Sequence, residues 1–200
     1  LLEWGDYSGL IDGGPPSAGK RLLQTLRDRG IDRLDWIIAT HPHSDHIGGL
    51  SDVVRAVPVD RFIASGYNAG SPLQRSLLRS LERRRGTRLQ RVAAEQTLDL
   101  GGGLAMYVFS PSEPFLQNTG NDPNNNSIVA RLDYGNVRML FAGDQERVGR
   151  QVLYGRLAAN PDGERALRAD VLKVAHHGIE DGTDRRFLRM VRPRYAVLFC

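Results

Sequence analysis

Cysteine, lysine and long apolar runs are all scarce in this sequence. The single cysteine, Cys200, excludes an internal disulfide and leaves no thiolate cluster that could hold a metal ion. Apolar runs such as Trp36–Ala39 fall far short of the ~20 residues that a membrane-spanning helix needs, so we expect no membrane insertion by this chain. The sequence opens at Leu1 without the charged and apolar segments of a signal peptide, and it leaves the compartment undecided.

The composition is that of one globular domain covering residues 1–200. Hydrophobic residues make up 40% and charged residues 25% of the chain, which predicts a single core without an inter-domain hinge. Lys20 and Lys173 are the only lysines, so the other 25 of the 27 basic residues are arginines. Arginine suits bidentate contacts to phosphate, but an arginine-favouring genome explains the same bias.

The predicted secondary structure alternates strands with helices and also contains a hairpin, Tyr134-Gly135-Asn136-Val137. Apolar runs bounded by turn residues predict strands at Gly9–Ile11, Leu34–Thr40, Arg61–Ala64, Leu89–Ala93, Leu104–Ser110, Ser127–Tyr134, Val137–Ala142, Val171–Ala175 and Tyr195–Cys200. Helical spacing predicts helices at Lys20–Arg29, Leu50–Ala56, Pro72–Arg85, Gln145–Ala159 and Asp184–Val191. We therefore expect an α/β (α+β) fold with helices outside two mixed sheets. The polar segment Asn118–Asn126 is either a mobile surface excursion or part of a site rim.

All histidines lie in two short stretches, each after a predicted buried strand. The five are His41, His43, His46, His176 and His177. Strand ends on a rigid sheet are good places to converge side chains on one point. In a near-extended backbone His41 and His43 present both rings to one side, and the following Asp45 and His46 can serve a second centre. This clustering predicts a metal site with nitrogen and oxygen ligands.

Asp144 is a third candidate element of the same site. It follows the predicted strand Val137–Ala142 and Gly143, whose missing Cβ lets the chain turn sharply. A carboxylate at that position can bridge two cations, although an aspartate at a strand end is equally often structural.

Separated segments of the chain form an ordered set of motifs. They are Leu10-Ile11-Asp12-Gly13-Gly14, His41-Pro42-His43-Ser44-Asp45-His46 with Gly48-Gly49, Asn124–Val129, Phe141-Ala142-Gly143-Asp144 and Asp170–Gly178. In this order they resemble the metallo-β-lactamase superfamily. Within it they resemble the hydrolase domain of ComEC-type competence proteins, which internalise DNA, and their stand-alone relatives. The match runs from Leu10 to Cys200.

The resemblance implies an αββα sandwich of two mixed β-sheets, with two divalent metal ions at one edge of the sheets. Carried over by position, the ligands are His41 and His43 on the first metal, Asp45, His46 and one of His176 or His177 on the second, and Asp144 between them. By the same resemblance Asp12 orients the metal loop, and loss of such a residue costs ~10–100-fold in affinity or activity. Zn²⁺ is the expected metal, and Mn²⁺ is the alternative because a site with few histidines is harder.

The sequence departs from the family pattern in two places. Superfamily members with a complete site have a further histidine on the first metal, but here none lies between His46 and His176. The first metal must therefore accept water or an Asn or Asp from Asp122–Ser127, or bind weakly. The family domain also begins before Leu1 and continues past Tyr195–Cys200, so we expect a fragment that lacks terminal strands.

The candidate catalytic residues are Asp45, Asp144 and His176. Two cations sharing Asp144 would lower the pKa of a bridging water enough to supply hydroxide near neutral pH, which suits phosphodiester hydrolysis. Neighbouring side chains on an extended segment point to opposite sides, so His176 and His177 cannot both approach one metal without a turn. By resemblance we assign the metal to His177, and His176 then contacts the phosphate or protonates the leaving oxygen.

Asn126 and Ser127 are candidate hydrogen-bond donors to substrate oxygens, and simple turn capping is the equal alternative. The resemblance implies that the substrate is DNA, single- or double-stranded, degraded during uptake by a monomeric domain. It also implies a soluble domain of a bacterial protein, either the extracytoplasmic part of an inner-membrane protein beside a membrane channel domain of the same chain, or a cytoplasmic stand-alone protein.

One feature of the sequence points to DNA independently of the resemblance. On the predicted helix Pro72–Arg85 a basic stripe, Arg75, Arg79 and Arg83, lies opposite the apolar stripe Leu77, Leu78 and Leu81. Arg84, Arg85, Arg88 and Arg91 extend it. Such a stripe can track a phosphate backbone, but most such stripes are only solvated helix faces.

Two other functions stay open. A small-molecule esterase, of the choline-phosphate esterase or lactonase type, would use the same metal scaffold and would show an acidic or aromatic cation pocket. A DNA-binding module with an inactive metal site would keep its DNA affinity after chelation and cleave nothing. The missing histidine disfavours a true β-lactamase.

Overall fold

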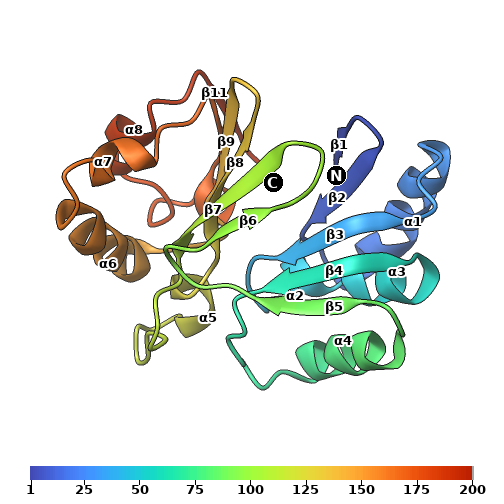
Figure 1. Cartoon of the computed structure of the whole chain (residues 1–200). Coiled ribbons are helices and arrows are strands. Elements are labelled where there is room, and N and C mark those ends of the chain that lie inside the picture. The colour runs from blue at the N-terminus through green and yellow to red at the C-terminus, as the bar shows by residue number, and fades with distance from the viewer. Residues whose placement is uncertain (200) are drawn as a thin grey trace. The chain divides into compact units, whose positions relative to one another are not determined.

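The computed structural model describes residues 1–199 (Figure 1). The chain divides into two compact units, Leu1–Val92 (unit 1) and Ala93–Cys200 (unit 2). Unit 1 contains β1 (Leu2–Trp4), β2 (Tyr7–Ile11), the 3₁₀ turn η1 (Pro16–Ala18), α1 (Gly19–Asp28), β3 (Leu34–Ala39), α2 (Ser44–Ile47), α3 (Leu50–Ala56), β4 (Val59–Ala64), α4 (Pro72–Arg83) and β5 (Arg88–Arg91). Unit 2 contains β6 (Thr97–Asp99), β7 (Leu104–Ser110), α5 (Asp122–Asn125), β8 (Val129–Tyr134), β9 (Val137–Phe141), α6 (Arg147–Ala158), α7 (Gly163–Ala166), β10 (Val171–Lys173), the 3₁₀ turn η2 (Ala175–Gly178), α8 (Arg185–Val191) and β11 (Tyr195–Val197).

Unit 1 is a mixed sheet whose strands follow the order β1-β2-β3-β4-β5. β1 and β2 form an antiparallel pair, and the remaining neighbours are parallel. Parallel neighbours need crossover connections, which α1, α3 and α4 supply in turn. In Figure 1 these helices lie beside the sheet, and their buried side chains, such as Leu26, Val53 and Leu81, join Ile37 and Phe62 in one core. Burial of β3 on both faces explains its continuous apolar sequence.

Helix α4 begins as its sequence predicts. The Ser71 hydroxyl accepts a hydrogen bond from the Gln74 backbone N–H at 3.1 Å, and Pro72 occupies the first helical position. The buried stripe is narrower than predicted, because Leu77 and Leu81 are buried whereas Leu78 is 40% exposed.

Unit 2 is a second mixed sheet, with the strand order β11-β10-β9-β8-β7-β6. Strands β6 to β9 pair antiparallel, whereas β9, β10 and β11 are parallel neighbours. The hairpin between β8 and β9 is the predicted two-residue turn, since Tyr134 pairs with Val137 and Gly135 has a φ of 55°. Leu153 of α6 and Phe187 of α8 pack with Leu140 and Leu172 of the sheet in a core of their own.

The predicted fold class, two mixed sheets with flanking helices, is confirmed. The main helices and strands lie where the sequence places them, but β1, β6 and the short helices such as α2 and α5 were missed. Elements of three or four residues are too short to show a period. Each of the two units has a hydrophobic core of its own. The prediction of a single domain stays a prediction. Cys200, the last residue of a predicted strand, lies outside the described residues.

Gly9 should be a stability-determining position of unit 1. It pairs with Trp36 in the sheet, and a Cβ added at Gly9 would lie 2.3 Å from the Trp36 ring. Because Trp36 is fully buried and cannot move away, Gly9→Ala should destabilise the protein by about 1–3 kcal/mol in urea denaturation.

The matched control for that variant is Gly155→Ala in α6, where an added Cβ meets nothing within 4 Å. This change should be neutral or stabilising by up to about 1 kcal/mol. Equal stabilities of Gly9→Ala and the wild type would contradict the close packing of β2 on β3.

Candidate metal centre

The first histidine stretch gathers three imidazole rings directly after β3. The backbone is still extended at His43, with φ −73° and ψ 152°, and α2 begins at the next residue. This helical turn brings His46 back, so that its ring centroid lies 4.1 Å from that of His41, while the His43 centroid lies 4.9 Å from His41. His41 and His46 are buried and Asp45 is exposed. Unit 1 thus brings together the ligands predicted from this stretch.

The carboxylate of Asp12 orients the segment from Thr40 to His46 by hydrogen bonds. Asp12 follows β2 with a φ of 55°, and it accepts hydrogen bonds from the Thr40 N–H and the Thr40 hydroxyl, both at 2.8 Å. It lies 2.7 Å from Nδ1 of His46. A carboxylate can only accept here, so His46 carries its proton on Nδ1 and keeps the Nε2 lone pair for a ligand.

Thr40 is a site residue that the sequence did not reveal. Its hydroxyl donates to Asp12, and the same oxygen lies 3.2 Å from Nδ1 of His41. A hydroxyl whose proton is already donated accepts from His41 Nδ1–H, so Nε2 is the nitrogen of His41 that carries the lone pair. The only sequence signal was a polar residue between an apolar strand and a histidine.

In unit 2 Asp144 is placed by the turn that follows β9. Gly143 has a φ of 53°, and a Cβ added there would lie 2.8 Å from the Ser127 Cβ, so the turn requires glycine as predicted. The buried carboxylate of Asp144 lies 3.3 Å from Nε2 of His177 through Oδ2 and 3.5 Å from Nζ of Lys173 through Oδ1. Lys173 is one of only two lysines in the sequence, but its position beside this carboxylate was not predicted.

The two adjacent histidines do not lie on an extended segment. β10 ends at Lys173, and His176 and His177 lie in η2 with left-handed φ values of 47° and 53°. The expectation of an extended backbone here was wrong, and the argument that the two side chains point to opposite sides fails with it. The backbone turns at the histidines themselves.

The two rings nevertheless have different neighbours. Nδ1 of His177 lies 3.0 Å from the Phe199 carbonyl, to which it donates, so its Nε2 presents a lone pair toward Asp144. His176 instead lies near Glu146, with 3.4 Å between Nδ1 and Oε1.

Glu146 is a second residue that the sequence did not reveal. Its carboxylate accepts hydrogen bonds from the side-chain amides of Asn121 at 2.8 Å, Asn124 at 2.9 Å and Asn125 at 3.4 Å. The run of asparagines was the available signal. The segment Asn118–Asn126, expected as a surface excursion or a site rim, folds into α5, whose buried asparagines surround Glu146 beside His176.

Asn126 and Ser127 have partners within the protein. The Asn126 amide accepts from the Leu116 N–H at 2.9 Å and donates to the carbonyls of Leu116 at 2.9 Å and Asp122 at 2.8 Å. The Ser127 hydroxyl accepts from the Asp144 N–H at 3.2 Å. These bonds match the alternative of local capping, and the contact of both residues with substrate stays a prediction.

Arg150 holds the segment that follows His177. Its buried guanidinium donates to the carbonyls of Asp181 and Gly182, both at 3.0 Å, and to the Asp184 carboxylate at 2.9 Å. Burial raises the pKa of Asp184, but hydrogen bonds from the Phe187 N–H, the Tyr154 hydroxyl and Arg150 outweigh it and keep this pKa below its usual range. The turn that carries His177 is therefore fixed at its C-terminal side.

The donor sets of both units fit divalent metal ions. Unit 1 offers imidazole nitrogens with the exposed Asp45 carboxylate, and unit 2 offers Asp144 and His177. Two ligands about 2.0–2.1 Å from a tetrahedral ion lie roughly 3.3–3.4 Å from each other. The 3.3 Å separation of His177 Nε2 and Asp144 Oδ2 agrees with that value.

Comparisons with known proteins agree with this donor chemistry. The model of the metallo-beta-lactamase superfamily matches residues 2–200. The chain is 29% identical over 188 residues to ComE operon protein 3 of Bacillus subtilis, covering 92% of this chain and 22% of that protein. It is 30% identical over 189 residues to competence protein ComA of Neisseria gonorrhoeae, covering 94% of this chain and 23% of that one.

Among solved structures, the metallo-beta-lactamase fold protein YhfI from Bacillus subtilis superposes with a TM-score of 0.54 at 16% identity, covering 99% of this chain and 78% of that one. The chain spans about a fifth of the length of the curated relatives it matches. The family match over nearly the whole sequence shows that this chain belongs to the metallo-β-lactamase superfamily.

Proposed function

We propose that this chain is a metal-dependent phosphodiesterase that cleaves DNA. The observation that carries the proposal is the group of three histidine rings at the end of β3, oriented by Asp12. Membership of a superfamily that is generally hydrolytic supports the hydrolase class. The competence relatives support DNA as the substrate.

We propose that the chain holds a centre for two divalent ions. The proposed ligands are His41 and His43 for the first ion, Asp45, His46 and His177 for the second, and Asp144 for both. Zn²⁺ is the expected metal and Mn²⁺ its rival. When bound, two such ions supply hydroxide near neutral pH and neutralise charge that builds on a phosphoryl oxygen.

The chain's own residues prepare this chemistry. Asp12 holds a proton on Nδ1 of His46, and Thr40 does the same for His41, so both rings present Nε2. The Glu146 carboxylate lies 3.4 Å from Nδ1 of His176. We assign to His176 the contact with the phosphate or the transfer of a proton to the leaving oxygen.

The basic stripe of α4 is the proposed DNA contact of unit 1. Arg75, Arg79 and Arg83 are all exposed. An exposed guanidinium can pair with phosphate at little cost of desolvation. No helix among residues 1–199 is long and apolar enough to cross a membrane, and the expected channel partner, the compartment and the monomeric state stay predictions.

Asp12→Asn should weaken metal binding while the fold is retained. An amide cannot accept all the hydrogen bonds that the carboxylate accepts, so His46 loses its fixed orientation. We expect about 10–100-fold lower affinity for Zn²⁺ in competition with a chromophoric chelator. Asp28→Asn, on the exposed end of α1, is the control and should bind as the wild type does. Unchanged affinity in Asp12→Asn would remove the orienting role.

The two adjacent histidines should separate in metal analysis. His177→Ala removes a proposed ligand, so the metal content after dialysis should fall by about one ion per chain. His176→Ala should keep its metal and lower turnover by about 10²–10⁴-fold, the usual contribution of a proton donor. Loss of metal from His176→Ala alone would reverse the two roles.

Replacing Arg75, Arg79 and Arg83 together by Gln should impair cleavage of DNA but not of a small phosphodiester. The three side chains lie on an exposed helix face outside the metal centre. If each contacts a phosphate, the slope of log affinity against log salt should fall by about 2–3 in the variant. Kinetics with an oligonucleotide and with bis(p-nitrophenyl) phosphate measure both effects. Equal loss on both substrates would rule out a DNA track on α4.

A further inference from the structure

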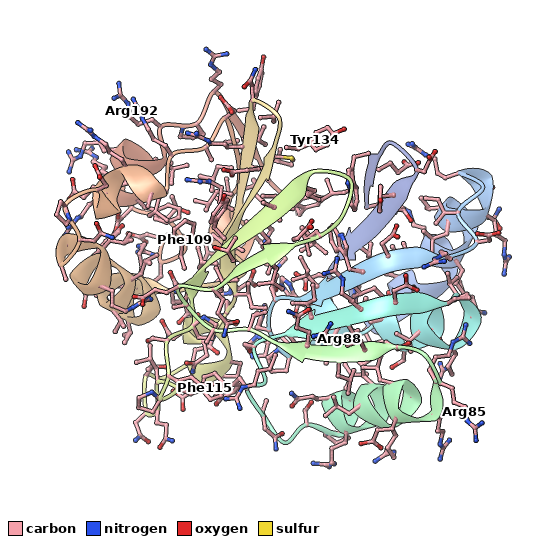
Figure 2. All side chains as sticks on the ribbon, viewed as in Figure 1. Arg85, Arg88, Phe109, Phe115, Tyr134 and Arg192 are labelled. Atoms are coloured by element: carbon pink, nitrogen blue, oxygen red, sulfur yellow. The ribbon has the colours of Figure 1, made fainter. Side chains whose placement is uncertain are left out.

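A basic pocket of about 600 Å³ lies in unit 2, away from Asp144 and His177. Its walls come from the β8–β9 hairpin, the turn before β10 and the turn between α8 and β11. These segments precede the parallel strands β9, β10 and β11, whereas Asp144 follows β9 and His177 follows β10. The pocket and these two proposed ligands therefore lie at opposite ends of the same strands. Figure 2 shows Arg192 and Tyr134 at one end of unit 2, and Figure 1 shows α5 at the other.

Four arginines and one aspartate carry the charge of the pocket. They are Arg138, Arg168, Arg192, Arg194 and Asp170. The Asp170 carboxylate accepts the Arg138 backbone N–H at 2.9 Å, and its carbonyl accepts the N–H groups of Arg194 at 2.8 Å and Tyr195 at 3.0 Å. Asp170 thus joins the three wall segments by accepting hydrogen bonds from their backbone N–H groups. None of these bonds involves a guanidinium group.

Three of these guanidinium groups have no acidic partner in the described part of the chain. Arg138 has only a distant one, Asp133 at 3.7 Å, and no ion pair within residues 1–199 involves Arg168, Arg192 or Arg194. Other exposed arginines of unit 2 do have partners, such as Arg186 with Glu164 at 3.4 Å. Like charges gathered around one hollow raise its positive potential and attract an anion.

Arg192 also occupies an unfavourable backbone position. It is the C-cap of α8, with left-handed φ 51° and ψ 53°, and its N–H bonds to the Leu188 carbonyl at 2.8 Å. Glycine is the usual residue at such a position. The chain nevertheless places an arginine there, on the wall of the pocket.

We propose that this pocket binds a ligand that carries two or more phosphate groups. Guanidinium forks match phosphate oxygens in bidentate pairs, and the positive charge of the walls matches several phosphate charges. The volume exceeds what one phosphate fills and lies in the ~300–1,000 Å³ range of ligand pockets. A nucleic-acid strand and a free oligophosphate present the same groups. The site shares no residue with the metal centre and does not depend on the proposed hydrolase activity.

Calorimetric titration with sodium tripolyphosphate tests the proposal on the full chain in EDTA, where no bound metal can attract the probe. The test variant is Arg168→Gln/Arg192→Gln/Arg194→Gln. Gln keeps an aliphatic stem with a polar end at these exposed positions, so we expect the fold to persist. Circular dichroism checks the fold. The control is Lys20→Gln/Arg21→Gln/Arg27→Gln, which removes the same charge from exposed positions of α1.

The wild type and the control should bind tripolyphosphate alike, and the test variant at least about tenfold more weakly, as expected when three charge-assisted contacts are lost. No binding by the wild type, or equal loss in both variants, would overturn the proposal. A fluorescein-labelled oligo(dT) then distinguishes the sources. Weaker oligonucleotide binding in the test variant assigns the pocket to a nucleic-acid strand, and unchanged binding assigns it to a free oligophosphate.

Discussion

The hydrogen bonds of the Asp12 carboxylate are the interaction on which the metal-binding loop of unit 1 depends. The Asp12 side chain, directly after β2, bonds both to Thr40, directly after β3, and to the ring of His46 in α2. The parallel pairing of β2 with β3 brings the two strand ends together, so the sheet itself sets this geometry. Without the carboxylate, the Thr40 N–H, the Thr40 hydroxyl and Nδ1 of His46 would lose their acceptor, and the histidines would lose their fixed tautomers.

Unit 2 uses the same physical device with different residues. Asp144 and the turn with His177 follow the neighbouring parallel strands β9 and β10. Gly143 allows the turn, Ser127 caps it, and Arg150 anchors the segment after His177. Each candidate ligand therefore belongs to a loop whose ends are fixed by a sheet and by buried hydrogen bonds. Loops held in this way keep their side chains close to one geometry, which a metal site requires.

The sequence was sufficient for the features that repeat or cluster. The apolar runs of β3 and β9 and the capped start of α4 predicted the bounds of these elements to within a few residues. The clustering of His41, His43 and His46 in the sequence predicted that their rings lie close together. The sequence was insufficient where the backbone leaves ordinary conformations. Nothing in its pattern reveals the left-handed φ of His176 and His177, because such values come from contacts of the whole turn. Thr40 and Glu146 were missed for a related reason, since their roles rest on partners distant in sequence such as Asp12 and Asn121.

The central claim is that the chain holds two divalent ions at the proposed ligands. Anomalous diffraction from crystals grown with Zn²⁺ or Mn²⁺ tests it most directly. The account predicts two anomalous peaks per chain, one at bonding distance from His41 and His43 and one from Asp45, His46 and His177, with Asp144 touching both. Bonds of about 2.0–2.2 Å are expected for zinc. Peaks that lie only at surface carboxylates, or no peak at the histidines in a crystal soaked with either metal, would contradict the account.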